Sequence, residues 1–238
     1  MAVLSGLKPE RVFAYFEKLC SVPHGSGNTK IISDMCVGFA KEMGLRYRQE
    51  PCNNVIIWKD ASAGYENAAP IILQGHIDMV CAKTDDCTKD MTTEGLDLMT
   101  DGEWVWADKT SLGGDNGIAV AMILAILEDE TLAHPPIEAV FTVDEEVGMD
   151  GAFALDCSDL KGRKLLNLDS EIEGVFTVSC AGGMPDISIA ICERSLSYKG
   201  FYGIHLIGAH NHQNLIRIVQ DGIACQHLDD VIPCQKRD

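Results

Sequence analysis

Apolar residues recur at helical spacing in three stretches of this chain and gather into short unbroken runs in several others. The spacing of Val12, Phe16 and Leu19 predicts a helix over residues 9–20, with Pro9 in its first turn. Two more helices are expected at 29–43 and 116–128. The apolar face of the helix at 29–43 is expected to consist of Ile31, Ile32, Met35, Phe39 and Ala40.

Short apolar runs bounded by turn residues predict the strands. They lie at residues 54–58, 70–80, 137–143, 164–168 and 175–179. We also expect a hairpin at 97–106, a short helix at 152–155 and a further helix at 215–219. Strands that alternate with helices are typical of a mostly parallel sheet covered by helices on both faces. The pattern therefore predicts an α/β protein with a three-layer α/β/α architecture.

The composition is that of a soluble globular protein, with 46% apolar and 23% charged residues. A formal net charge of −17 argues against nucleic acid as a partner, because its phosphates would be repelled. No apolar run is long enough for a membrane span, and the first residues do not form a signal peptide, so we expect a cytoplasmic protein. The ten cysteines contain no Cys-x-x-Cys pair and are expected to be reduced thiols.

The predicted strand at 70–80 presents a histidine and then a carboxylate. His76 and Asp78 point to the same side of an extended chain, because strand side chains alternate with a period of two. A neutral imidazole is a good zinc ligand, and a carboxylate or carbonyl usually holds its second ring nitrogen. The pair indicates a metal site, although a loop histidine beside a solvated aspartate would give the same short pattern.

Four more carboxylates occupy similar places. Asp115 lies in a Gly-Gly-Asp-Asn-Gly turn, Glu145 and Glu146 follow a predicted strand, and Asp169 follows another. Ligands of parallel sheets bind beyond the carboxyl ends of the strands, so these groups could meet His76. Histidine with carboxylates suits zinc, or manganese and cobalt, and a carboxylate that binds no metal can move protons. Taken singly, the alternatives are a solvated acidic turn at 145–146, a helix cap at 113–117 and a strand-end turn at Asp169.

Four motifs in this order resemble the M20 family of metallopeptidases, and more narrowly its aminoacyl-histidine dipeptidases. They are Gly-His-Ile-Asp-Met-Val at 75–80, Gly-Gly-Asp-Asn-Gly at 113–117, Thr-Val-Asp-Glu-Glu-Val-Gly at 142–148 and Asn-Leu-Asp at 167–169. Segments 21–28 and 179–183 match the same subfamily. The likeness covers roughly residues 5–184.

The resemblance implies a site for two zinc ions, with manganese or cobalt as substitutes and a hydroxide bridging the metals. The implied metal ligands are His76, Asp115, Glu146 and Asp169, with Asp115 shared between the ions. Glu145 would be the general base and acid, and Asp78 would orient His76. The implied reaction is the hydrolysis of small dipeptides with a free N-terminus, those with a C-terminal histidine among them.

The likeness stops near Met184, whereas members of the family continue with a lid domain, a further histidine ligand and the rest of the catalytic domain. We therefore expect a partial catalytic domain at 1–184, incomplete at its C-terminal side, and an atypical tail at 185–238, truncated or shifted in reading frame. Gly-Ala-His-Asn-His at 208–212 is a candidate for the missing ligand. Turnover is expected to be reduced, and whether the chain forms the family's homodimer is left open. The alternatives are an N-acyl amino acid amidohydrolase on the same scaffold and a non-catalytic metal-binding fragment.

Overall fold

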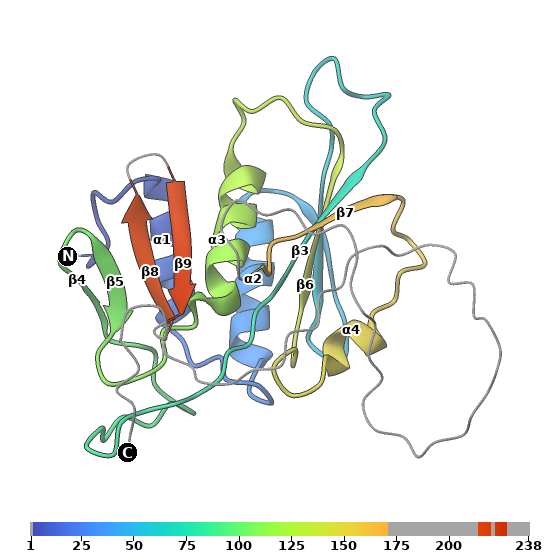
Figure 1. The fold of residues 1–238 in the computed structure, drawn as a ribbon. Coiled ribbons are helices and arrows are strands. Elements are labelled where there is room, and N and C mark those ends of the chain that lie inside the picture. The colour runs from blue at the N-terminus through green and yellow to red at the C-terminus, as the bar shows by residue number, and fades with distance from the viewer. Residues whose placement is uncertain (1, 171–213, 220–221, 228–238) are drawn as a thin grey trace, which may run out of the picture.

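The computed structural model describes residues 2–170, 214–219 and 222–227, and these build a central five-stranded sheet with helices beside it (Figure 1). The strand order across the sheet is β1-β2-β6-β3-β7. The strands are β1 (Arg46–Gln49), β2 (Val55–Lys59), β3 (Ile71–His76), β6 (Ile137–Thr142) and β7 (Lys164–Asn167).

The central sheet is mostly parallel, as predicted. Strand β3 runs parallel to both β6 and β7, while β2 is antiparallel to β6 and to β1. Within this sheet β2 is therefore the one strand that runs against the others. Every residue of β2 and β6 is buried, which explains why both are mainly apolar and do not alternate with polar residues. The exceptions are Lys59 in β2 and Glu138 and Thr142 in β6.

Three helices pack on one face of this sheet and enclose the larger part of the core. They are α1 (Glu10–Cys20), α2 (Lys30–Glu42) and α3 (Gly114–Glu128). Helix α3 lies between α1 and β3 and is apolar on nearly all sides for that reason. Its close approach requires Gly75, because a Cβ atom there would lie 2.5 Å from Oδ1 of Asn116.

The other face of the sheet has a smaller cover in the described part of the chain. The short helix α4 (Asp150–Ala154) and the segment at 155–165 lie over it. A second apolar cluster forms there from Ile56, Trp58, Ile72, Val140 and Leu160. The predicted three-layer arrangement is present, and the helical layer on this second face is incomplete in the described residues.

A second, four-stranded sheet stands beside α1 and α3 (Figure 1), in the order β4-β5-β8-β9. Its strands are β4 (Leu98–Thr100), β5 (Trp104–Ala107), β8 (Asn214–Val219) and β9 (Gly222–His227). The hairpin predicted at 97–106 is confirmed as β4–β5, whose turn is held by Asp101 Oδ1 accepting the N–H groups of Glu103 and Trp104. The helix predicted at 215–219 is wrong, because these residues lie in β8. Their β-branched composition favours a strand.

Three local predictions differ from the structure. Strand β1 was not expected, because its Arg-Tyr-Arg-Gln sequence has no apolar run. Ile31 is 48% exposed and does not belong to the buried face of α2. Strand β3 is shorter than the predicted 70–80, because the chain leaves the sheet after His76 to form the site described below.

Several predictions fall where the structure gives no description. The strand at 175–179, the domain boundary at 184 and the histidine pair at 210 and 212 lie outside the described residues. Six cysteines within residues 2–170, at positions 20, 36, 52, 81, 87 and 157, are free thiols, as predicted. No helix in the described ranges combines the length and apolarity that crossing a membrane demands.

Candidate metal centre

His76 is the last residue of β3 and is almost completely buried, with 1% of its surface exposed. Its Nδ1 lies 3.0 Å from the backbone oxygen of Asp78. A carbonyl oxygen can only accept a hydrogen bond, so Nδ1 carries the hydrogen and donates it. That contact leaves Nε2 as the nitrogen that can bind a metal. Nε2 faces Asp115, whose Oδ1 is 3.1 Å away.

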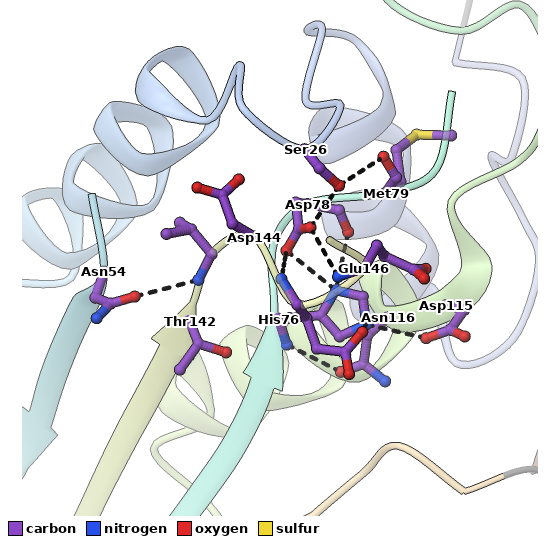
Figure 2. Close-up of polar contacts among 12 residues, drawn as sticks. Ser26, Asn54, His76, Asp78, Met79, Asp115, Asn116, Thr142, Asp144 and Glu146 are labelled. Atoms are coloured by element: carbon purple, nitrogen blue, oxygen red, sulfur yellow. Dashed lines mark hydrogen bonds and ion pairs between the residues drawn. The ribbon is translucent and has the colours of Figure 1, made fainter. Parts of the chain in front are cut away.

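Asp78 is a buried carboxylate held by four donors. Its Oδ1 accepts the N–H of Glu145 at 3.1 Å and lies 3.4 Å from His76 Nδ1. Its Oδ2 accepts the hydroxyl of Ser26 at 2.8 Å and the N–H of Glu146 at 3.4 Å (Figure 2). Burial by itself raises the pKa of Asp78, but the hydrogen bonds from His76 and Ser26 outweigh it and hold the pKa below its usual value. Asp78 is therefore ionised and fixed in orientation behind His76.

Asp115 lies where the chain enters α3, at residues whose backbone is not yet helical. The next residue, Asn116, anchors this turn, and the peptide bond between the two is cis. Asn116 Oδ1 accepts the N–H of His76 at 3.2 Å, and its Nδ2 donates to the backbone oxygen of Leu168 at 2.9 Å. Asn116 thus ties α3 to the ends of β3 and β7, which places Asp115 beside His76.

Glu145 and Glu146 follow β6 in a turn that begins at Asp144, whose φ is +54°. Asn54 fixes the base of this turn, since its Oδ1 accepts the N–H of Val143 at 3.2 Å and its Nδ2 donates to Gly151. Both glutamate N–H groups point to Asp78, and Glu145 Oε2 lies 3.9 Å from His76 Nε2.

Three of the predicted ligands meet at one point. One ligand atom from each of His76, Asp115 and Glu146 lies within 4.8 Å of the other two. A nitrogen and two carboxylate oxygens at this spacing fit the donor set of zinc. Asp169 is outside this group of three but lies near Asp115, whose carboxylate contributes to raising the pKa of Asp169.

The centre concentrates negative charge in a buried place. Burial, followed by the nearby Asp115 carboxylate, raises the pKa of Glu146 to about 7, and the same two causes raise that of Asp169 to about 7. Burial also raises the pKa of Glu145. In the described part of the chain, no lysine or arginine forms an ion pair with these three carboxylates. A bound cation would therefore relieve a charge repulsion that the fold leaves in place.

A cavity of about 330 Å³ opens beside the centre, on the second face of the sheet. Glu145 and Asp169 lie on its wall. A row of hydrogen bonds runs along its wall. Asn167 donates to the Gln74 side chain, and Gln74 donates to the Thr142 hydroxyl at 3.1 Å. Apolar side chains complete the lining: Met149, Phe153, Leu155, Leu160 and Leu165 among them.

The structure adds three supporting residues that carried no predicted role. Ser26 and Asn54 are far in sequence from the groups they hold, at separations of 52 residues from Asp78 and 89 from Val143. No sequence spacing could reveal such contacts. Asn116 was available as a signal, because it lies inside the Gly-Gly-Asp-Asn-Gly motif beside the predicted ligand.

The chain resembles known dipeptidases in sequence and in fold. The chain is 42% identical over 201 residues to the cytosol non-specific dipeptidase of Escherichia coli K12, a match over 84% of this chain. It also superposes on the crystal structure of aminoacylhistidine dipeptidase from Vibrio alginolyticus with a TM-score of 0.69 and 45% identity over 72% of this chain. Over most of its length the chain is thus similar in sequence and fold to two dipeptidases. No family model matches it.

The chain spans 41% of the length of the Escherichia coli protein and 35% of the Vibrio chain. A tripeptidase structure from Staphylococcus aureus superposes with a TM-score of 0.59 and 20% identity. The match includes 73% of this chain and 46% of the tripeptidase chain. That likeness shows a shared fold. Together these comparisons confirm the predicted resemblance to aminoacyl-histidine dipeptidases and the predicted α/β fold.

Proposed function

We propose that this chain carries the metal centre of a dipeptidase that hydrolyses small dipeptides with a free N-terminus, including those with a C-terminal histidine. The observation that carries the proposal is the meeting of His76, Asp115 and Glu146 within 4.8 Å, beside a third carboxylate, Glu145. The names of the relatives support the substrate class, since one is called a cytosol non-specific dipeptidase and the other an aminoacylhistidine dipeptidase. The first name also supports a cytoplasmic location.

We assign the metal ligands to four residues: His76, Asp115, Glu146 and Asp169. Zinc bound there, as two ions or with manganese or cobalt in its place, would act as a Lewis acid on the scissile carbonyl and on the attacking water. His76 is suited to its role because Asp78 fixes its tautomer and leaves Nε2 available. Asp115 is suited to a shared position because it neighbours both His76 and Asp169.

Glu145 is assigned as the general base and acid. Its carboxylate lies outside the group of three but only 3.9 Å from His76 Nε2, so it faces the same space. Burial raises its pKa, which makes the carboxylate a better proton acceptor near neutral pH. Glu145 would take a proton from the attacking water and return it to the leaving amine nitrogen.

The test is hydrolysis of glycyl-histidine and β-alanyl-histidine by the 238-residue chain with added zinc or manganese. Release of free histidine is followed over long incubations, because turnover is expected to be low. Glu145→Gln should bind zinc with unchanged affinity and lose at least about 100-fold in rate, the lower end of the range for a general base. The matched control is Glu66→Gln, an exposed loop glutamate that accepts the Gly64 N–H and should change neither quantity.

The outcomes separate the alternatives. Turnover that survives in Glu145→Gln would contradict its assignment as the base. Hydrolysis of N-acetyl-glycyl-histidine without hydrolysis of the free dipeptide would indicate an N-acyl amino acid amidohydrolase. Zinc binding without hydrolysis of any of these substrates would indicate a non-catalytic metal-binding protein.

A further inference from the structure

Asp78 receives a hydrogen bond from the loop between α1 and α2, a part of the chain that contributes no metal ligand. Ser26 donates its hydroxyl to Asp78 Oδ2 at 2.8 Å, the shortest contact that this oxygen makes. The N–H of Glu146, at 3.4 Å, is the other donor to Oδ2 in the described residues. The orientation of the carboxylate on that side therefore depends mainly on one serine hydroxyl.

The loop holds this hydroxyl in a fixed place. The N–H of Ser26 donates to the backbone oxygen of Met79 at 3.2 Å, and the N–H of Met79 donates to that of His24 at 3.1 Å. Glycine at residue 25 lets the loop pass close to Cys81, since a Cβ atom there would lie 2.4 Å from Sγ of Cys81. Figure 2 shows Ser26 reaching from this loop to both Asp78 and Met79.

The same loop also contacts the turn that carries the glutamates. The N–H of Gly27, whose φ is +76°, donates to Asp144 Oδ1 at 2.6 Å. Asp144 immediately precedes Glu145 and Glu146, whose own N–H groups donate to Asp78. The loop therefore holds two carboxylates, Asp78 and Asp144, on either side of the candidate base.

We propose that Ser26 is a positioning residue that sets the geometry of His76 and of the 145–146 turn through the Asp78 carboxylate. If the hydroxyl is removed, Oδ2 keeps only the long contact to Glu146, and the carboxylate can rotate about its Cβ–Cγ bond. Rotation moves Oδ1 away from the Glu145 N–H and from His76 Nδ1, while the contact of Nδ1 with the Asp78 backbone oxygen stays in place. The metal-binding consequence rests on the proposed function, whereas the effect on the 145–146 turn does not.

The experiment compares Ser26→Ala and Ser26→Thr in the full 238-residue chain. Zinc affinity is measured by competition with a chelator, and the exchange rates of the Glu145 and Glu146 N–H protons are measured by NMR in the metal-free protein. Removing support around a metal ligand typically lowers metal affinity 10- to 100-fold. For Ser26→Ala we expect about a tenfold loss of zinc affinity and at least tenfold faster exchange at Glu145. The exchange rate of Val140, deep in β6, should be unchanged.

Ser26→Thr keeps the hydroxyl at a half-buried position and should restore both quantities to within twofold. The matched control is Ser33→Ala, which removes another hydroxyl that is bonded within the fold, at 2.7 Å from the Asn53 oxygen, but touches no residue of the centre. Ser33→Ala should leave zinc affinity unchanged.

Two results would overturn the proposal. One is a Ser26→Ala protein whose zinc affinity and Glu145 exchange both stay within twofold of the unaltered chain. The other is an equal loss of zinc affinity in Ser33→Ala, which would show a general effect of weaker packing. If the unaltered chain binds no zinc, the proposed function fails, and the exchange rates alone decide the role of Ser26.

Discussion

Lys59 offers a sharp test of how the fold holds the helix that carries Asp115. Its ammonium group is buried at the C-terminal end of α3, with 7% of the side chain exposed. It donates to the backbone oxygens of Leu127 and Asp129, both at 2.8 Å, and to that of Ile126 at 3.4 Å. A lysine from β2 thus satisfies the last carbonyls of the helix, which have no partner inside it.

The substitution Lys59→Met keeps the length of the side chain and removes the donor. Two short hydrogen bonds from a charged group contribute about 1.5–3 kcal/mol each, and burying the ammonium offsets a few kcal/mol of that sum. The carbonyls left without a partner in apolar surroundings cost about 1–3 kcal/mol each. We therefore expect a loss of about 2–4 kcal/mol in the free energy of unfolding.

The assay is urea unfolding of the metal-free chain, followed by circular dichroism. The matched control is Lys109→Met, which removes an exposed ammonium paired with Asp86 at 2.7 Å and should leave the free energy of unfolding almost unchanged. A Lys59→Met protein that loses less than about 1 kcal/mol, or no more than Lys109→Met, would refute the view that this lysine secures α3. A change in the slope with urea would show that the unfolded state had changed as well.

Two further predictions concern buried carboxylates. Glu138→Gln should destabilise the chain by roughly 1–3 kcal/mol in urea unfolding, because the buried Glu138 carboxylate accepts the N–H groups of Lys161 and Gly162 at 2.9 Å each; an unchanged midpoint would contradict this. The metal-free chain should lose stability as the pH rises from about 5 to 8. Glu146 and Asp169 keep their protons up to about pH 7 when folded but release them near pH 4 when unfolded, so the folded state binds more protons in that window. Zinc should flatten this dependence of the melting temperature, whereas stability that rises with pH would contradict the pKa values.

Much of the fold could be predicted because its central elements are simple patterns. The mainly apolar sequences of β2 and β6 predict buried strands, and the aspartate and glycine of the 101–102 turn predict a hairpin. Strand β1 could not be found in this way, because its polar residues pair with β2 only once β2 is in place. Ile31 followed the helical spacing but faces outward, since spacing fixes the relative angle of side chains and not which side meets the core.

In the candidate centre, too, some features follow from the sequence and others only from the tertiary structure. The chain by itself determined that a histidine and several carboxylates follow strands or a glycine turn, because those positions are local properties of 75–78, 113–117 and 142–146. Only the tertiary structure decided which side chains meet, since contacts such as Ser26 with Asp78 join residues 52 positions apart. It also decided their protonation, because burial and the neighbouring carboxylates set the pKa of Glu146. Such contacts depend on how α3 packs against the sheet. The periodic patterns of helices and strands relate only residues that are close in sequence, so they do not predict these contacts.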